Sequence, residues 1–512
     1  MKEIIFYGDD AFFYEFPEDI DIYYAKPPIT PIKNQELAIE HAIKNPINSP
    51  KLQDLINSNS TIAICFDDIS VPLPPMKNEI RKIAAEIVLK ILKEIGVKDE
   101  NLYFLCATGL HRKCKPKELK YLLGKKLYRK YKDRIFNHDA EDKINLKTLG
   151  KTQEGDKIQI NKLATDADLI IYLNISFVPL NGGWKSIIVG LGSYNTIIPH
   201  HSPQTLRQGS YMDPESSELH HIIWEMGDLI KDKLKVFTIE MVINNNFYSG
   251  IYKRIYKPLK STQRKPSLWR GLALTTLKAL PKFIKAYVRK NLKANYELID
   301  VFAGDIEETH KKSLELMNTQ LNVEISKKYD IIIYGVPNLT PYNVGSEMNP
   351  LLLHNLVSGY LFNMHQGESP LKNNGTLIIS NPAYEKFDSE QHVSYKDFYY
   401  DIMTKNHDIF NLKEVEYEYL DNKKYIEKYR NQYAYHPVHA PIVYYWGVRG
   451  LLKIENIIVA GAKNKDVLKV LGYEYAENLD EAIENAKRRY PNNCSIAYFC
   501  IPPLFIAKLI KN

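Results

Sequence analysis

Short apolar runs alternate with longer amphipathic stretches along this 512-residue chain, and this alternation restricts its fold more than any other feature. Residues 62–66, 102–106 and 169–173 have the length and continuous apolarity of strands buried on both faces. Helices are expected at 79–95, 310–318 and 479–490, and further strands at 237–243, 331–335, 376–380, 457–460 and 496–500. Strands that alternate with helices are typical of α/β layers with mainly parallel sheets.

The distribution of charge divides the chain into three parts. Residues 251–296 contain thirteen Lys or Arg and no Asp or Glu, so without them the net charge of +7 would be −6. Apolar residues recur there at steps of three and four from Trp269 to Val288, interrupted by Pro281, which predicts a basic amphipathic helical segment. We therefore expect an N-terminal α/β domain at 1–250, a basic helical insertion at 251–298 and a C-terminal α/β domain at 299–512, with the active site in the cleft between the two α/β domains.

The basic insertion has three interpretations. Such a segment can lie on an anionic membrane surface, contact phosphates, or pack over the cleft or against a second subunit with a solvated basic face. Few aromatic residues are interleaved with its cations and no nucleic-acid-binding motif accompanies them, so we expect no nucleic acid partner. Of the two remaining interpretations, we favour packing over the cleft or against a second subunit. Contact with an anionic membrane is the alternative.

The composition is that of a sizeable globular protein. With 45% hydrophobic and 25% charged residues, the chain can bury two or three cores. It contains no run of eighteen apolar residues and does not begin with the layout of a signal peptide, so we expect a cytoplasmic protein. Its five cysteines include no Cys-x-x-Cys pair, which argues against a zinc knuckle or a disulfide framework.

Residues 180–201 combine a candidate covalent anchor with a candidate metal ligand. Gly182 and Gly183 precede Lys185, and because glycine has no Cβ, a planar ligand could approach the backbone closely there. Lysine is a residue to which cofactors attach covalently, and neutral imidazoles such as those of His200 and His201 are common ligands of late transition metals. The alternative is a glycine-rich turn with a surface lysine, followed by histidines in a loop.

Further polar clusters occur where the first predicted strands end. Asp67, Asp68 and Ser70 follow the run at 61–66, and Gly109 and His111 follow the run at 102–106. His138 comes after the basic helix that ends near residue 134. In open α/β sheets, ligands bind outside the carboxyl ends of the strands, so we expect these clusters to converge at one edge.

The order and spacing of these motifs resemble those of the nickel-pincer-nucleotide lactate racemase family. The resemblance is strongest from residue 62 to 213 and continues more weakly at 301–305 and in the C-terminal region. It implies a pyridinium mononucleotide whose thiocarboxyl groups hold nickel, tethered to a lysine through a thioamide and completed by a histidine ligand. By position, Lys185 matches the tether and His201 the nickel ligand. Asp68 matches a carboxylate of the nucleotide and substrate pocket, and we assign four neighbours to the same pocket: Ser70, Gly109, Gly182 and Gly183.

The resemblance also implies a reaction. In that family a hydride leaves C2 of a 2-hydroxy acid for the cofactor and returns to either face, while two histidines move the hydroxyl proton. His111 matches one of these histidines, and imidazole suits the task because its ordinary pKa lies near neutrality. For its partner we consider first three histidines of the C-terminal half and then His138, which we predict together with His111 as the catalytic residues. The three are His392, His436 and His439.

Three positions depart from the family's pattern. Ile175 stands where the second proton-moving histidine would lie, and Val71 stands where an arginine would bind the substrate carboxylate. Glu347 lies where the family carries a cation near the substrate. We therefore predict a racemase- or epimerase-like isomerase that acts on a small hydroxy acid or related alcohol other than lactate. The alternatives are a protein that binds the pincer cofactor without catalysis, and a membrane- or partner-associated protein on the same fold.

Overall fold

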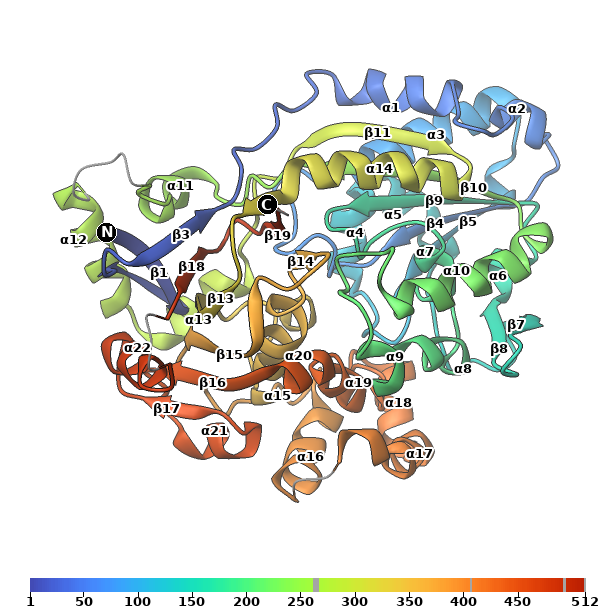
Figure 1. Cartoon of the computed structure of the whole chain (residues 1–512). Coiled ribbons are helices and arrows are strands. Elements are labelled where there is room, and N and C mark those ends of the chain that lie inside the picture. Colours follow the sequence, from blue (N-terminus) through green and yellow to red (C-terminus); the bar gives the residue numbers. More distant parts are fainter. Residues whose placement is uncertain (261–266, 406–407, 491–493, 511–512) are drawn as a thin grey trace.

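Two large sheets, each flanked by helices, lie beside one another in the computed structural model (Figure 1). The structure describes residues 1–260, 267–405, 408–490 and 494–510. Strands and helices alternate in both halves of the chain, and most neighbouring strands of the two sheets are parallel. The predicted α/β fold class with mainly parallel sheets is therefore confirmed.

The first sheet has six strands in the order β11-β10-β9-β4-β5-β6. β4 and β9 are buried along their whole length because they are apolar on both faces, and β11 is the one strand that runs antiparallel to its neighbour. The strands are β4 (Ile62–Asp67), β5 (Leu102–Ala107), β6 (Ile135–Asn137), β9 (Leu169–Ser176), β10 (Val236–Ile243) and β11 (Leu298–Gly304). The associated helices are α1 (Gln35–Lys44), α2 (Leu52–Leu55), α3 (Arg81–Ile95), α4 (Pro116–Leu123), α5 (Lys125–Tyr131), α6 (Lys162–Thr165), α10 (Glu218–Ile230) and α14 (Ile306–Leu321).

The second sheet has eight strands, with six in the order β17-β16-β15-β13-β1-β2 and β18 paired to both β13 and β3. The strands are β1 (Lys2–Gly8), β2 (Asp10–Glu15), β3 (Ile20–Tyr24), β13 (Tyr329–Pro337), β15 (Leu371–Ser380), β16 (Ile454–Ala460), β17 (Glu474–Ala476) and β18 (Ile496–Cys500). The helices of this half are α15 (Pro350–His354), α16 (Val393–Asp401), α17 (Lys413–Asp421), α18 (Lys423–Asn431), α19 (His439–Tyr445), α20 (Val448–Lys453), α21 (Lys465–Leu471) and α22 (Leu479–Lys487).

Smaller elements complete the fold. β7 (Leu146–Lys151) and β8 (Lys157–Asn161) form a hairpin, and β12 (Asn322–Ile325), β14 (His365–Gln366) and β19 (Ile506–Leu509) form a three-stranded sheet. Three short helices follow β9 in the chain: α7 (Lys185–Ile188), α8 (Tyr194–Ile197) and α9 (Pro203–Leu206). Among the described residues, no helix combines the length and the apolarity that crossing a bilayer requires.

The membership of strands in the two sheets does not follow the domain boundaries expected at residues 250 and 299. The strands β1 to β3 open the chain but belong to the second sheet, where Tyr7 of β1 pairs with Val336 of β13. β11 lies beyond residue 297 but pairs with β10 in the first sheet. Pairings between such distant segments leave no mark in the local apolar pattern, which is why the sequence placed both segments in the wrong half.

The basic insertion forms helices, as its apolar spacing predicts. Its described part contains α11 (Gly250–Tyr256), α12 (Leu268–Ala279) and α13 (Lys282–Lys290), while residues 261–266 lie outside the described residues. Pro281 separates α12 from α13 because proline cannot continue a helix that precedes it. The three helices lie at one end of the molecule beside β1 and β2 (Figure 1), and α12 packs on β2.

Candidate functional site

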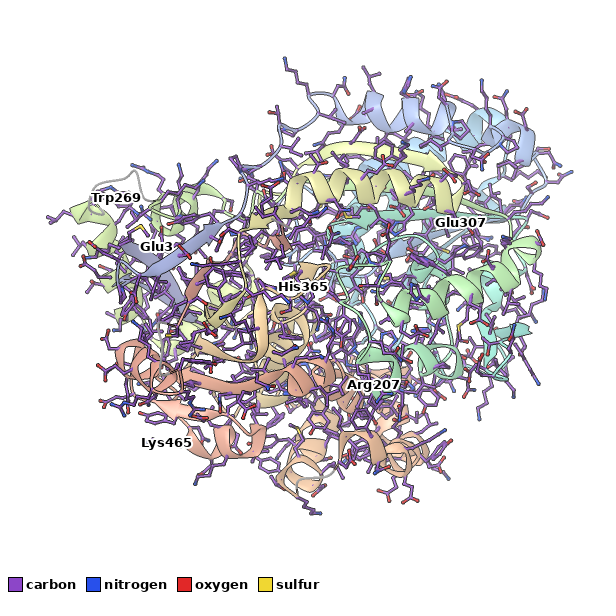
Figure 2. All side chains as sticks on the ribbon, in the orientation of Figure 1. Glu3, Arg207, Trp269, Glu307, His365 and Lys465 are labelled. Atoms are coloured by element: carbon purple, nitrogen blue, oxygen red, sulfur yellow. The ribbon has the colours of Figure 1, made fainter. Side chains whose placement is uncertain are left out.

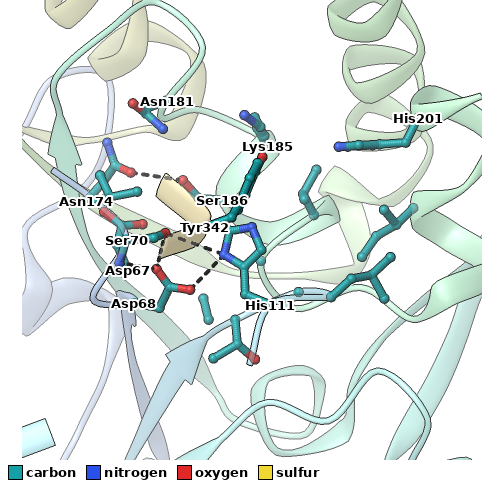
Figure 3. Close-up of a pocket in the computed structure, with 18 of the residues that line it drawn as sticks. Asp67, Asp68, Ser70, His111, Asn174, Asn181, Lys185, Ser186, His201 and Tyr342 are labelled. Atoms are coloured by element: carbon teal, nitrogen blue, oxygen red, sulfur yellow. Dashed lines mark hydrogen bonds and ion pairs between the residues drawn. The ribbon is translucent and has the colours of Figure 1, made fainter. Parts of the chain in front are cut away.

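Polar side chains from three neighbouring strands of the first sheet meet in one pocket (Figure 3). Asp67 and Asp68 stand at the end of β4, His111 follows β5, and Asn174 lies near the end of β9. Parallel strands end at the same edge of a sheet, so these clusters converge as expected. The pocket contains about 730 Å³ of empty space, including its open mouth. Lys185 and His201 also line it, and Figure 3 shows both directed toward the same space.

Lys185 is held in the pocket by the turn that precedes α7. Its Nζ donates a hydrogen bond to the carbonyl oxygen of Leu180 at 2.8 Å. Burial lowers the pKa of this amine to about 7, and the charge of Asp67 opposes that shift only in part. A large fraction of Lys185 is therefore uncharged near neutral pH, which is the form of a lysine that can be acylated.

His201 carries a neutral imidazole beside this amine. Burial, followed by the charge of Lys185, lowers its pKa to about 3. Nδ1 of His201 lies 2.7 Å from Nδ1 of His200, so the two rings share one proton across that contact. When His201 donates in this bond, its Nε2 keeps a free lone pair and can bind a metal. Within the described ranges no group of three or more His, Cys, Asp or Glu side chains is arranged around a metal position, so His201 is a candidate for a single ligand.

His111, Asp68 and Ser70 form a hydrogen-bonded chain at the pocket's edge (Figure 3). Nδ1 of His111 lies 2.8 Å from Oδ2 of Asp68, and the hydroxyl and backbone N–H of Ser70 donate to Oδ1 at 2.5 and 2.8 Å. Burial raises the pKa of Asp68, but the charge and hydrogen bond of His111 and the two bonds from Ser70 outweigh it and keep the pKa below its ordinary value. The carboxylate thus fixes the ring through Nδ1 and leaves Nε2 of His111 for a substrate.

A buried arginine holds the turn that carries these carboxylates. Nη1 of Arg81 donates to the carbonyl oxygens of Asp67 and Asp68 at 2.9 and 3.0 Å, while Nε and Nη2 bind the carboxylate of Glu79. The side chain of Asp67 accepts from Tyr172 at 3.1 Å, and burial raises its pKa to about 7. Sequence analysis missed Arg81, because an arginine at the start of an amphipathic helix has no local mark that distinguishes it from a solvated one.

The glycines before Lys185 have a different role from the one expected. A Cβ on Gly182 would lie 2.6 Å from Nδ1 of His310, and a Cβ on Gly183 would lie 2.7 Å from Cδ2 of the same ring. The backbone φ angles are +107° and +56°, and the N–H of Gly183 donates to Glu240 at 2.9 Å. The two glycines therefore admit the buried His310–Glu240 pair beneath the loop, because this pair occupies the space that their Cβ atoms would fill.

Position 109 requires glycine because of its backbone conformation and a nearby carbonyl group. Its φ is +52°, and a Cβ there would lie 2.7 Å from the carbonyl oxygen of Val189. Gly109 and Gly182 line the pocket, as does Ser70, whereas Gly183 is not among its lining residues. The predicted cofactor residues thus share one region, and the glycines contribute to it through backbone shape.

His138 is not brought to the pocket with His111. Its ring is fully buried, with Nε2 2.9 Å from the carbonyl oxygen of Gly192 and Nδ1 3.0 Å from the side-chain nitrogen of Asn161. Burial lowers its pKa to about 4. Its partners are Asn161, at the end of β8, and Gly192, between α7 and α8, so His138 joins these two segments and has no ring nitrogen free for a substrate.

The C-terminal half supplies another part of the wall, which includes Tyr342, His439 and Trp446. His439 packs edge-on against His111, with ring centroids 5.4 Å apart, and its Nδ1 lies 2.5 Å from the hydroxyl of Tyr395. The other two histidines considered from this half are engaged elsewhere: His392 with the carbonyl of Tyr342, and His436 with Glu141. Helix α19 carries His439 and is distant in sequence from β5, so no spacing in the sequence predicts this contact.

The three departures from the family's pattern lie in three different environments. Val71 lines the pocket, whereas the side chain of Ile175 is buried in β9 and its backbone N–H donates to Asp67 at 2.7 Å. Glu347 binds Arg289 and Lys290 of the insertion at 2.9 and 2.7 Å and does not line the pocket. The position where the resemblance expects a cation near the substrate thus lies outside this pocket, and its Glu347 is bound by the basic insertion.

Comparison with known proteins shows similarity to lactate racemases. Residues 7–212 match the lactate racemase N-terminal domain. The chain is 24% identical over 351 residues to a lactate racemase of Thermoanaerobacterium thermosaccharolyticum, and 30% identical over 173 residues to one of Lactiplantibacillus plantarum. These alignments cover 68% and 33% of this chain, and 66% and 39% of the two relatives.

Two solved structures share the fold. The lactate racemase apoprotein from T. thermosaccharolyticum superposes with a TM-score of 0.63 at 20% identity, over 99% of this chain and 100% of that one. A crystal structure of a protein from Thermotoga maritima superposes with a TM-score of 0.50 at 16% identity, over 95% of this chain and 100% of that one. The similarity therefore extends over both halves of the chain, although the domain match ends at residue 212.

Proposed function

We propose that this chain is a divergent member of the lactate racemase family and an isomerase of that type, a racemase or epimerase acting on a hydroxy acid or related alcohol other than lactate. The observation that supports this most strongly is the pocket itself. It combines a lysine whose pKa is lowered to about 7, a neutral imidazole, and a histidine bound to a carboxylate. Val71, in place of the expected arginine, removes the partner of a lactate carboxylate.

The donor set fits a lysine-tethered nickel-pincer mononucleotide. Lys185 has the uncharged fraction that attachment needs, and His201 can present Nε2 to nickel when its Nδ1 donates to His200. Such a group, when bound, supplies reversible acceptance of a hydride from a carbinol carbon. Asp68, Ser70 and Gly109 line the region where the rest of that group would lie.

Within this proposal the side chains of the protein manage the proton. Nε2 of His111 accepts the proton of the substrate hydroxyl and later returns it. Asp68 stabilises the imidazolium that forms, and Ser70 holds Asp68 in place. One histidine is sufficient if the hydroxyl oxygen of the substrate stays beside His111 in both stereoisomers. The carbinol carbon then presents one face or the other to the hydride acceptor.

The second candidate is a protein that binds the cofactor without turnover. The replacements at Ile175 and Val71 favour it, because both remove groups that the resemblance associates with the substrate. The two candidate functions assign different roles to His111, because only an isomerase needs it to move a proton. His111→Gln in protein loaded with nickel should lower turnover about 100- to 10,000-fold if His111 moves the proton.

The experiment measures interconversion of stereoisomers by chiral chromatography on a panel of hydroxy acids and secondary alcohols, with nickel content determined on the same samples. His138→Gln is the matched control, since this histidine is buried outside the pocket. Turnover that disappears in the His111 variant with nickel retained supports an isomerase. Nickel-loaded protein that converts none of the panel favours the second candidate.

A further inference from the structure

A large apolar cavity opens from the pocket and bears on the nature of the substrate. It contains about 1230 Å³ of empty space, including its mouth, and shares His111, Lys185 and His201 with the pocket. Most of its lining is apolar, from both halves of the chain, and includes Val71, Phe177, Leu180, Met212, Leu356 and Leu361. A substrate that reaches His111 therefore lies against a surface that favours hydrocarbon over polar groups.

The charges around this cavity disfavour a carboxylate. Lys185 is the single Lys or Arg among the described residues that line the pocket or the cavity, and the carboxylate of Asp68 adds negative charge to the pocket. Acylation of Lys185 would remove the one amine. A substrate carboxylate would then find no lysine or arginine of the described lining to pair with, and burial of a carboxylate without such a partner is unfavourable.

We propose that the substrate is a neutral secondary alcohol with a large apolar body and no carboxylate beside the carbinol carbon. This inference rests on the proposed function, because it takes the reacting hydroxyl to lie at His111. Val71 has a direct part in it: the side chain lines both the pocket and the cavity, so apolar surface stands where the resemblance expects a carboxylate-binding arginine.

The test compares two ligands of the same carbon skeleton, 4-phenyl-2-butanol and 2-hydroxy-4-phenylbutanoate. Their binding to the nickel-loaded protein is measured by calorimetry, and their stereochemical interconversion by chiral chromatography. The neutral alcohol should bind at least about 10-fold more tightly than the acid. Val71→Arg should reverse this preference, because it places a guanidinium in the cavity wall.

Equal or tighter binding of the acid, or no measurable binding of the alcohol, would overturn the inference about the substrate. Interconversion of the acid alone would do the same while leaving the isomerase proposal intact. Binding of the alcohol without any interconversion of either compound would support the cavity's preference and contradict the isomerase proposal. The two proposals therefore fail in different ways.

The basic insertion carries a second inference, which rests on its own surface. Its helices α12 and α13 leave large apolar side chains exposed: Leu268 (95%), Leu272 (70%), Phe283 (75%) and Tyr287 (69%). Figure 2 shows Trp269 at the outer edge of the same end of the molecule. Several exposed apolar residues on two adjacent helices indicate an interaction surface, whereas single exposed residues are common on any protein.

One described cation of the insertion, Arg270, is buried and binds the carbonyl oxygens of Ile255 and Lys257. The other described cations form two groups. Lys285, Arg289 and Lys290 bind Asp10, Asp9 and Glu347, and so attach α13 to the body of the protein. Others lie exposed, and in the described part of the chain they make no ion pair: Lys253, Arg254, Lys257, Lys260, Lys278, Lys282 and Lys293. The surface therefore combines apolar side chains with unpaired positive charge.

We infer that this surface docks on an anionic lipid bilayer. Exposed aromatic and aliphatic side chains can enter the headgroup region, while nearby lysines and arginines bind anionic lipids. Charge complementarity favours this occupant over a second copy of the chain, since two copies of the same cationic surface would repel each other. A neighbouring cavity extends from this surface: it is lined by Leu277, Leu280 and Val288, and it shares Phe247 and Leu339 with the large apolar cavity.

Co-sedimentation of the full-length protein with vesicles tests this inference. Binding is expected to vesicles that contain phosphatidylserine, to fall with added salt, and to be weak with phosphatidylcholine alone. The double substitution Leu268→Glu and Phe283→Glu should lower binding at least about 10-fold, whereas Ile144→Glu, which changes an exposed apolar residue of the first half, should not. Equal binding by the two variants, no binding to either vesicle, or a dimer in solution that the double substitution dissociates would overturn it.

Discussion

The two parts of the pocket wall differ in chemistry. The wall from the first sheet carries Lys185, His201 and the His111–Asp68 pair, at positions that match the family's motifs. The wall from the C-terminal half is built from Tyr342, His439, Ile442 and Trp446, of which Tyr342 and Trp446 also line the large cavity. The groups proposed for the cofactor thus come from the first half alone, whereas the apolar surface proposed to select the substrate is shared by both halves and includes Val71 and Phe177 from the first. Substitutions in either half can therefore change that surface while Lys185 and His201 are kept.

The largest expected effect concerns the proposed anchor. Lys185→Ala removes the one amine among the described residues that line the pocket, so we expect nickel retention to be lost and turnover to fall at least about 1000-fold. Nickel analysis and chiral chromatography on the purified variant measure both. Lys162→Ala, at an exposed lysine of the same half, should behave as the parent protein does. An active Lys185→Ala variant that holds nickel would show that the anchor lies elsewhere.

Asp68→Asn tests the charge behind His111. The amide can still hold the ring but cannot stabilise an imidazolium, so kcat should fall about 100-fold while nickel content stays unchanged. Ser70→Ala should have a smaller effect, because Ser70 acts only through the carboxylate. If kcat falls by the same factor in both variants, Asp68 acts by orienting the ring of His111 rather than by its charge.

His201→Ala removes the proposed nickel ligand. We expect nickel affinity to fall more than about 100-fold, and His200→Ala, which leaves the ligand but removes its hydrogen-bond partner, to lower it by about 10- to 100-fold. Titration of each variant with a nickel chelator measures the difference. A larger loss in the His200 variant would make His200 the ligand.

The smallest expected effect is a pH dependence of the apoprotein. Burial lowers the pKa of Lys185 to about 7, so its reactive uncharged form increases about 10-fold per unit below that pH and levels off above it. Competitive labelling with acetic anhydride, followed by peptide mass analysis, measures this curve. Exposed lysines in general continue to gain reactivity toward pH 10. If the labelling of Lys185 depends on pH in the same way as that of exposed lysines, its pKa is not lowered.

The same two walls explain what the sequence can predict. Apolar runs mark β4, β5 and β9, and the clusters after them converge because parallel strands end at one edge of a sheet. The positions of Asp68 and His111 follow from that rule, whereas Lys185 and His201 are assigned to the same site through the resemblance to the lactate racemase family. The first wall is thus largely predictable, since its residues are close to the strands that position them.

The second wall is not predictable in this way, because distant elements build it. His439 reaches His111 from α19, and β1 joins β13 across more than three hundred residues of sequence. His310 explains why Gly182 must be glycine, although no local pattern links the two. His138 resembles a site residue in sequence but hydrogen bonds to a neighbouring loop. Each of these outcomes depends on tertiary contacts rather than on local periodicity.

The most direct test of the central claim is the mass of the peptide that contains Lys185, measured together with nickel content on full-length protein produced alongside a pincer-cofactor biosynthetic pathway. The account predicts a nucleotide-sized adduct on Lys185 and about one nickel per chain, with the nickel lost in His201→Ala. An unmodified Lys185 and no nickel, in protein made while the cofactor is available, would contradict it.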